Sequence, residues 1–560
     1  MIRTFFLGLL IPVLTLAQTD NSEFRATWVI TWEHMGTTAE VGQAKIREIL
    51  DNHVAANMNA VLFQARQSGT AYYNSSYEPW GYYAGYQDPG YDPLVYAVSE
   101  AHKRGLELHA WFNVFQASSM HTGAPAYEHP EWVCRDQSGI PMNEARALSP
   151  GLDAVREYTL NVAMELVNNY DIDGLHLDYI RWNEYSNGRR QDLTPQEEES
   201  LLDGIISETQ LQALENSRTG RYLYDVDHPY SAGVPAGFSS WEEWWRWSVT
   251  EFVQQLHDSI QAIKPYVRLS AAALGKYNWS GWQGYGSVYQ DAALWFNQGY
   301  VDQLTPMHYH WTNASGFLGM LVNDCPNCWS DYLTDGIMAN RIYSVGPGSY
   351  ILDENGVWSN HESIINAVRT VDWVDGFQFF SYGTWDYHDY WSDARETFFS
   401  RKTKMPVNVS GTGTAPAAPN LMLTALDSLH YDIQVVPAGG TVSWTIIYRS
   451  QDDVVDLSSD EIIHVDFGDS LVHFTDEFDG TQDYNGTYFY YATQANRFWA
   501  ESEPSIAAES DSIPSFAPVI ISSYPVPQDS VPVAIENHGS RDRQWCDYNH
   551  TGSRSQSGVA

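Results

Sequence analysis

Eight short apolar segments recur between Glu23 and Phe399, and they constrain the fold more than any other feature of the sequence. Most of them are continuous rather than alternating, as expected of strands that are buried on both faces. The predicted strands are Ala26–Ile30, Ala60–Gln64, Leu106–Phe112, Gly174–Asp178, Val267–Ala272, Gln303–Met307, Gly336–Ala339 and Gly376–Phe380.

The segments between these strands have apolar residues at helical spacing. One example is the segment 244–263, whose stripe is Trp245, Val249, Phe252, Leu256 and Ile260. A strand and a helix repeated eight times predict an α/β fold, a closed parallel (β/α)8 barrel of the TIM type over residues 18–405. An open doubly wound sheet is the alternative, but no glycine-rich phosphate loop follows the first strand.

The rest of the chain divides by composition. Residues 1–17 are typical of a signal peptide, so we expect a protein that is secreted or held in the periplasm or cell envelope. No later stretch has the roughly 18–20 continuous apolar residues of a membrane span. Residues 406–420 are predicted to be a linker, 421–506 a small β-sandwich similar to fibronectin type III, and 507–560 a mobile tail.

Charge and cysteine content limit the partners. The formal net charge is −40, from 30 Lys and Arg against 70 Asp and Glu, so we expect no nucleic-acid partner.

Cys325 and Cys328 form a C-P-N-C pair, for which a local disulfide is favoured over zinc. No cofactor is predicted. The 22 Trp and 36 Tyr suit either sugar stacking or a large core.

The reactive groups of a (β/α)8 barrel lie where the strands end. The predicted ends are rich in amides, arginine, aromatic rings and histidines. Amides and arginine pair with hydroxyl groups, and rings stack on sugar faces, so we expect a glycan site without metal. The predicted binding residues are Trp32, Gln64, Arg66, Trp111, Asn113, His176, Tyr179, Arg181, His308, Tyr309, Trp311 and Tyr382.

A glycosidase needs two carboxyl groups. Asp178 is the main candidate, because its alternation with His176 points both side chains into the barrel mouth. The alternative is an ion pair of Asp178 with Arg66 or Arg181 that only holds the barrel. For the second carboxyl group we consider Glu33 and Asp386, which follow the first and last strands, and Glu184, just past the fourth strand.

The residues above favour a glycoside hydrolase, but two other functions are compatible with the sequence. A non-catalytic glycan-binding protein would explain the many aromatic residues of "EPWGYYAGYQ" (residues 78–87) and the lack of a clear second acid. A metal-dependent hydrolase would use His308 and His310, which share a face if they lie on one strand.

Six ordered segments between residues 23 and 400 resemble the bacterial glycosyl-hydrolase-like 10 family. They are "EFRATWVITWEH", "NAVLFQARQSGTAYYNSSYEPW", "PGYDPLVYAVSEAHKRGLELHAWFN", "HPEW", "LSPGLDAVREYTLNVAMELVNNYDIDGLHLDYIRW" and "FVQQLHDSIQAIKPYVRLSAA".

The resemblance implies a (β/α)8 barrel in a secreted or envelope protein that acts on glycans, in some members on the glycan strands of the bacterial cell wall. It also implies a site lined by Gln64, Arg66, Trp111, Asn113, His176, Asp178 and Tyr309. Two positions depart from the family pattern. A second acid often follows the Asp178 position, where this chain has Tyr179, and Gln-x-Tyr-Trp is replaced by Met307-His308-Tyr309-His310.

Overall fold

We describe the protein from a computed structural model. The described residues are 21–142, 147–182, 222–279, 281–323, 328–411, 413–427, 430–439, 443–477 and 487–510. The chain divides into two units, residues 1–513 and 514–560, and every described residue belongs to the first. The predicted signal peptide, Glu184, Cys325 and the chain beyond residue 510 lie outside the described residues.

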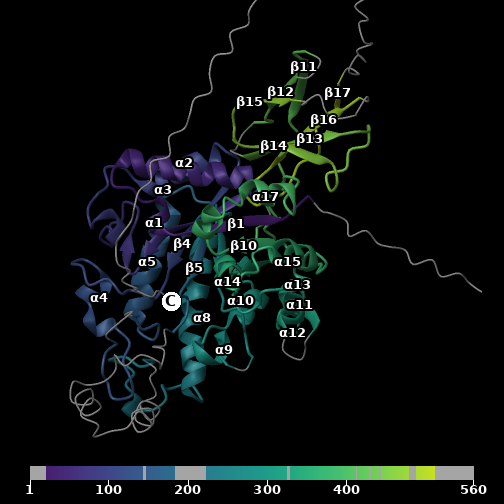
Figure 1. The fold of residues 1–560 in the computed structure, drawn as a ribbon. Helices are drawn as coiled ribbons and strands as arrows, with labels where there is room; N and C mark the ends of the chain where they lie inside the picture. The colour runs from purple at the N-terminus through teal and green to yellow at the C-terminus, as the bar shows by residue number, and fades with distance from the viewer. Residues whose placement is uncertain are drawn as a thin grey trace, which may run out of the picture. The chain divides into compact units, whose positions relative to one another are not determined.

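In the described part of the chain, eight parallel strands form a closed barrel in which each strand pairs with the next (Figure 1). The ring closes because β1 pairs with both β2 and β10, so the predicted TIM-type barrel is confirmed and the open sheet is excluded. The strands are β1 (Phe24–Val29), β2 (Ala60–Gln67), β4 (Glu107–Asn113), β5 (Gly174–Asp178), β6 (Arg268–Ala271), β7 (Gln303–Leu304), β9 (Ile342–Pro347) and β10 (Gly376–Phe379). Two short strands extend this sheet, β3 (Thr70–Ala71) beside β2 and β8 (Met307–His308) beside β9.

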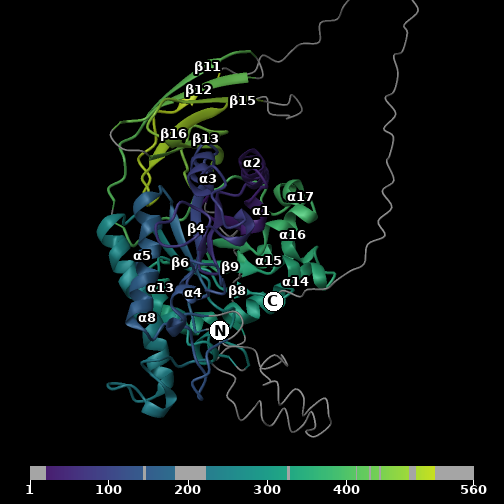
Figure 2. The same cartoon turned by 90° about the vertical axis from the view of Figure 1, so that its left-hand side faces the viewer.

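Helices surround the barrel (Figure 2). The main helices after successive barrel strands are α2 (Ala39–Ala55), α3 (Pro93–His102), α5 (Asp153–Asn169), α8 (Trp241–Ile263), α10 (Ala292–Gln298), α13 (Thr334–Met338), α15 (Asn360–Val368) and α17 (Trp391–Glu396). The predicted stripe of α8 is buried along its whole length. Shorter helices lie in the connections: α1 (Thr31–His34), α4 (Pro125–Glu128), α9 (Gly284–Ser287), α11 (Ala314–Leu318), α12 (Trp329–Tyr332), α14 (Ser349–Glu354) and α16 (Tyr382–Tyr387).

None of the helices in the described ranges has the length and apolar character needed to cross a membrane.

The seventh strand is not where the sequence predicted it. Gly336–Ala339 falls at the end of helix α13, and the strand is β9, Ile342–Pro347. The apolar residues of "GIMAN" therefore belong to the last turn of a helix. The chain turns at Asn340, whose φ is +52°, a left-handed value that asparagine adopts more readily than most residues. Asn340 and Arg341 consequently precede this strand rather than end it.

The C-terminal strands form two antiparallel sheets. One contains β11 (Asn420–Ala425), β12 (His430–Val436) and β15 (Val472–Glu477); the other contains β13 (Ser443–Ser450), β14 (Glu461–Gly468), β16 (Phe489–Ala495) and β17 (Ala508–Glu509). Ile433 and Val435 from the first sheet pack in one buried cluster with Ile447 and Tyr490 from the second. The similarity to fibronectin type III and the domain boundaries remain predictions.

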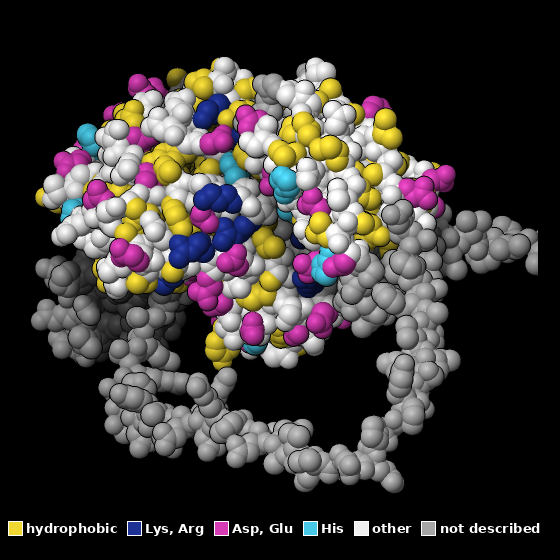
Figure 3. All heavy atoms as spheres, turned by 90° about the horizontal axis from the view of Figure 1, so that it is seen from above, with side chains coloured by type: hydrophobic (Ala, Val, Ile, Leu, Met, Phe, Trp, Pro, Cys, Tyr) yellow, Lys and Arg dark blue, Asp and Glu magenta, His cyan; other side chains and the backbone are white. Residues whose placement is uncertain are grey.

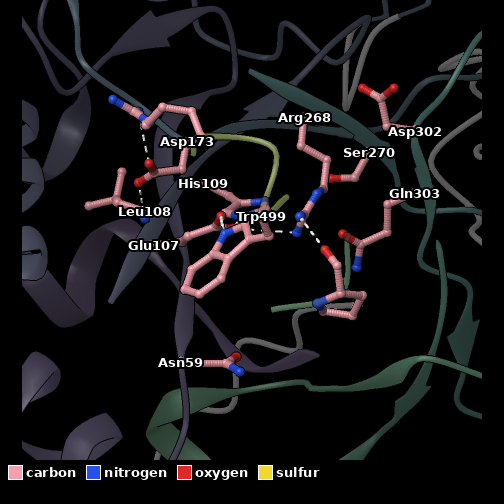
Figure 4. A network of polar contacts seen from close by, with 12 residues as sticks. Asn59, Glu107, Leu108, His109, Asp173, Arg268, Ser270, Asp302, Gln303 and Trp499 are labelled. Atoms are coloured by element: carbon pink, nitrogen blue, oxygen red, sulfur yellow. Dashed lines mark hydrogen bonds and ion pairs between the residues drawn. The ribbon is translucent and has the colours of Figure 1, made fainter. Parts of the chain in front are cut away.

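A buried polar network joins these sheets to the amino ends of the barrel strands (Figure 4). Glu107, at the start of β4, accepts a 2.5 Å hydrogen bond from the indole of Trp499. Its other oxygen lies 2.8 Å from His109 Nε2 and 3.4 Å from Arg268 Nη1. Arg497 binds Asp173 at 2.8 Å in the same region. His109 therefore lies at this end of the barrel and not at the carboxyl end of β4.

A cleft of about 260 Å³ lies near the same end, between the start of β2 and β4 and strand β14. Its lining includes Lys103, Arg104 and Lys402, and Figure 3 shows Lys and Arg side chains gathered near the centre of the face seen from above. Lys103 is ion-paired with Glu100, as is Arg104. Because catalytic groups of such barrels lie at the carboxyl ends of the strands, this cleft is not the candidate site.

We expect Glu107→Ala to lower the free energy of unfolding by about 3–5 kcal/mol, because it leaves the buried Arg268 guanidinium without its carboxylate. Urea denaturation measures the change. The control is Glu131→Ala, which removes a half-exposed pair with His129 and should cost about 1 kcal/mol or less. Equal losses in the two variants would contradict a structural role for the Glu107 network.

Candidate functional site

Asp178 is the last residue of β5 and is buried at the carboxyl end of the barrel. Its Oδ1 accepts a hydrogen bond of 2.7 Å from the backbone amide of Tyr179. Tyr179 has a φ of +50°, which is uncommon for a bulky residue, and the chain turns sharply there. Backbone strain of this kind is concentrated at functional sites.

The surroundings of Asp178 suit proton transfer. Burial raises the pKa of its carboxyl group, while the charge of Arg181, the amide of Tyr179 and the indole of Trp111 lower it. The net direction is upward, so the protonated form is populated closer to neutral pH than in an ordinary aspartate. A carboxyl group in a strand-end cleft with opposing influences of this kind is a typical acid–base candidate.

Two polar atoms near Asp178 have no partner among the described residues. They are the hydroxyl of Tyr309 and Nη1 of Arg181, and both are buried. Burial raises the pKa of the Tyr309 hydroxyl, and the nearby Asp178 carboxylate raises it further. Buried polar groups normally have hydrogen-bond partners, so two unpaired ones beside a carboxylate indicate a place for a polar ligand.

Aromatic rings form the wall of this site. The ring centre of Trp28 lies 6.2 Å from Trp111, 6.2 Å from Tyr309 and 5.4 Å from Phe380. Tyr350 completes the group at 5.6 Å from Tyr309. The predicted binding residues do not include Trp28, Tyr350 or Phe380. For Trp28, the alternation of Phe24, Ala26 and Trp28 along β1 is the signal in the sequence that could have identified it.

His176 holds this wall in place from inside the barrel. Its Nε2 accepts a hydrogen bond from the indole of Trp28 at 3.0 Å, so the proton is on Nδ1, which donates to Ser270 Oγ at 2.9 Å. Burial lowers its pKa to about 3, and the ring is neutral at physiological pH. His176 therefore positions Trp28, and both ring nitrogens of His176 are hydrogen-bonded within the protein.

Gln64, Asn113 and Arg66 lie at the ends of β2 and β4, but their polar groups are bonded to other groups of the protein. Gln64 accepts from the Thr31 amide at 3.2 Å and donates to Asn113 at 3.4 Å. Arg66 is fully buried and binds Glu78 through Nε and Nη2 at 2.8 and 2.6 Å. Its Nη1 donates to backbone carbonyls, including that of Asn113. The predicted alternative of an Asp178–Arg66 pair is therefore not what the structure contains.

The two histidines of the sixth strand do not converge. His308 is buried, and its Nδ1 accepts from the Gly346 amide at 3.1 Å, which leaves Nε2 to donate to the Tyr343 hydroxyl at 3.2 Å. His310 is exposed, because strand β8 ends at His308 and the chain turns. The expected shared face is wrong, since it assumed that the strand continued through residue 310. Trp311 is partly exposed, 6.1 Å from the ring of Trp279.

The candidates for the second carboxyl group differ in their surroundings. The oxygens of Glu33 accept from the amides of Ile30 and Gly383 at 2.6 and 2.7 Å. Burial raises the pKa of Glu33 to about 7, and the charge of Asp386 adds to the rise. Asp386 is exposed and accepts from the Tyr382 hydroxyl at 3.3 Å.

Tyr382 and Trp32 lie away from the Asp178 wall. The hydroxyl of Tyr382 accepts from Asn52 at 3.0 Å, and its ring stacks on His53 at 6.1 Å, so it packs against helix α2. This placement does not bring Tyr382 together with Asp178 as predicted, because α16 turns outward after β10. Trp32 is 42% exposed and contacts Tyr83 on the rim.

The chain is similar to one protein family and to individual proteins of known sequence. A model of the family described as glycosyl hydrolase-like 10 matches residues 23–335. A protein named glycosyl hydrolase YngK from Bacillus subtilis (strain 168) is 26% identical over 541 residues, which cover 90% of this chain and 96% of that protein. Glycosyl hydrolase DigH from Escherichia coli (strain K12) is 25% identical over 299 residues, 48% of this chain and 59% of DigH; the match thus spans less than two thirds of that relative.

Among solved structures, the chain is similar to the PgaB (BpsB) glycoside hydrolase domain from Bordetella bronchiseptica. The identity is 14%, the TM-score is 0.40, and the match covers 67% of this chain and 97% of that one.

We expect His176→Gln to weaken the dependence of stability on pH. Because the folded pKa is about 3 and the ordinary value is 6.5, the unfolded chain binds one more proton than the folded chain between these values. His176 thus makes the free energy of unfolding rise with pH in this window and fall on acidification. Removing it should reduce the slope by about 1.4 kcal/mol per pH unit between pH 4 and 6 in urea titrations. An unchanged slope would mean that the ring is protonated in the folded protein.

Proposed function

This chain belongs to the glycosyl hydrolase-like 10 family, and we propose that it is a secreted glycoside hydrolase in which Asp178 carries the central carboxylate chemistry. The observation that supports this role is the conjunction at the end of β5. A buried carboxyl group with a raised pKa lies near Tyr309 Oη and Arg181 Nη1, which have no partner among the described residues, and beside an aromatic wall.

Each part of this site has a chemical use in cleaving a glycosidic bond. The carboxylate of Asp178 would attack the anomeric carbon or activate a water molecule. Arg181 and Tyr309 would bind sugar hydroxyls, and in doing so would satisfy their own unpaired atoms. The rings of Trp111 and Phe380 would exclude water and pack against the apolar faces of the sugar.

For the second carboxyl group we assign Glu33 rather than Asp386. A proton donor must be protonated near neutral pH, and a pKa of about 7 meets that requirement. Gly383 makes this position possible, because a Cβ atom at residue 383 would come within 2.4 Å of Glu33 Oε1. Asp386 is exposed and contributes its charge, which helps to raise the pKa of Glu33.

The proposed substrate is a bacterial or environmental polysaccharide, with the glycan strands of peptidoglycan as the first to test. The resemblance of six sequence segments to the family and the signal-like residues 1–17 support this choice. The same residues support secretion, to the exterior or to the cell envelope.

A second candidate function is glycan binding without turnover. The exposed rings of Trp32, Tyr82 and Tyr83 favour it, since rings of this kind bind sugars whether or not a bond is broken. Release of reducing ends distinguishes the two functions, because a binding protein releases none.

We expect the wild-type protein to release reducing ends from peptidoglycan sacculi or another polysaccharide, and Asp178→Asn to lower kcat by about 10²–10⁴-fold with an unchanged Tm. The amide keeps the size of the side chain but cannot act as base or nucleophile. The control is Asp225→Asn, which changes a buried aspartate of the β5–α8 connection that is bonded to Ser149. Full activity of Asp178→Asn would refute the assignment.

Glu33→Gln should remove the proton donor and lower kcat on substrates with poor leaving groups, whereas Asp386→Asn should lower it only slightly. Loss of the Asp386 charge should also shift the alkaline limb of the pH–rate profile to lower pH, because that charge raises the pKa of the proton donor Glu33. If Glu33→Gln lowers the Tm but leaves kcat unchanged, Glu33 only caps the chain at Ile30 and Gly383.

A further inference from the structure

A continuous strip of aromatic rings lies at the surface near the barrel mouth. Trp32 contacts Tyr83 at 5.6 Å, Tyr83 contacts Tyr82 at 5.2 Å, and Tyr82 contacts Tyr86 at 6.1 Å. The strip ends where Tyr86 stacks on His121 at 4.1 Å, with only 8° between the ring planes. We call these five residues the ring strip.

The members of the ring strip come from three separate connections. Trp32 follows β1, the three tyrosines lie between β3 and α3, and His121 follows β4. All three connections leave the carboxyl ends of barrel strands, as does the chain after Asp178. The ring strip is therefore on the same end of the barrel as the candidate site.

Three of the five rings are exposed although they are large and mainly apolar, and Tyr86 and His121 are partly exposed. Tyr82 is 68% exposed, Trp32 42% and Tyr83 40%. Isolated exposed rings are common in proteins, but a contiguous group is characteristic of a binding surface. Burial in the core therefore does not account for the ring strip.

The backbone beneath the strip is held in place before any ligand binds. The amide of Tyr83 donates to the hydroxyl of the buried Tyr72 at 3.3 Å. Gly81 packs directly on the Tyr72 ring, since a Cβ atom there would lie 2.3 Å from it. The amide of Tyr86 donates to the Gly81 carbonyl at 3.1 Å. A surface fixed in this way loses little conformational entropy on binding.

We propose that the ring strip is an extended binding site for a polysaccharide strand, which it holds outside the site of Asp178. The substrate class is thus a long polymer rather than a short oligosaccharide. The ring strip contains no Lys, Arg, Asp or Glu, so it would hold a strand by ring stacking on sugar faces rather than by charge. The choice of a glycan as ligand rests on the proposed function.

The test is co-sedimentation of the full chain with insoluble chitin, cellulose and peptidoglycan sacculi. We expect the wild type and Asp178→Asn to bind at least one of these polymers equally well. The double variant Tyr82→Ala/Tyr83→Ala should bind at least about fivefold more weakly, because two stacking surfaces are lost. Tyr82→Phe/Tyr83→Phe keeps both rings and should bind like the wild type.

The matched control is Tyr387→Ala, which removes a tyrosine that is 82% exposed and outside the ring strip. It should leave binding unchanged, and Tm measurements on every variant exclude unfolding as the cause of a loss. Binding of none of the three polymers by the wild type would overturn the proposal, as would full binding by the double alanine variant. Binding by the ring strip without release of reducing ends would refute the proposed function but support this site. Release of reducing ends without binding by the ring strip would refute this site alone.

Discussion

Closure of the parallel sheet through β1 is the constraint on which the rest of the structure depends. β1 pairs with β2 on one side and β10 on the other, and without either ladder the sheet would have two open edges. Closure brings the carboxyl ends of all the barrel strands to one rim. Side chains that are hundreds of residues apart in the sequence, such as Trp28 and Phe380, therefore meet in one wall.

The interior of the barrel connects this closure to the site. Trp28 on β1 donates to His176 on β5, and His176 in turn donates to Ser270 on β6. These bonds cross the barrel beneath Asp178, while the neighbouring residues Leu175 and Leu177 face outward and pack with the helices. The polar side chains of β5 thus lie in the barrel interior and the apolar ones lie in the outer core, as the alternation of a strand requires.

Polar side chains at the two ends of the barrel differ in whether they have hydrogen-bond partners. At the amino end, Glu107 is bound by Trp499, His109 and Arg268, and the bonds tie the C-terminal sheets to the barrel (Figure 4). At the carboxyl end, Tyr309 and Arg181 keep polar atoms without partners in the described part of the chain. Satisfied groups stabilise a fold, and unsatisfied groups beside a carboxylate are what a ligand can use.

The sequence by itself determined the barrel and the position of Asp178, because strand and helix periods are local and eight repeats leave few alternatives. It misplaced the seventh strand, where the apolar residues of a short helix resemble a strand. Only the tertiary structure decided which polar residues are free to bind a ligand. Arg66 pairs with Glu78, and His308 with Tyr343 and Gly346, because folding brings together groups whose distance in the chain has no periodic signal.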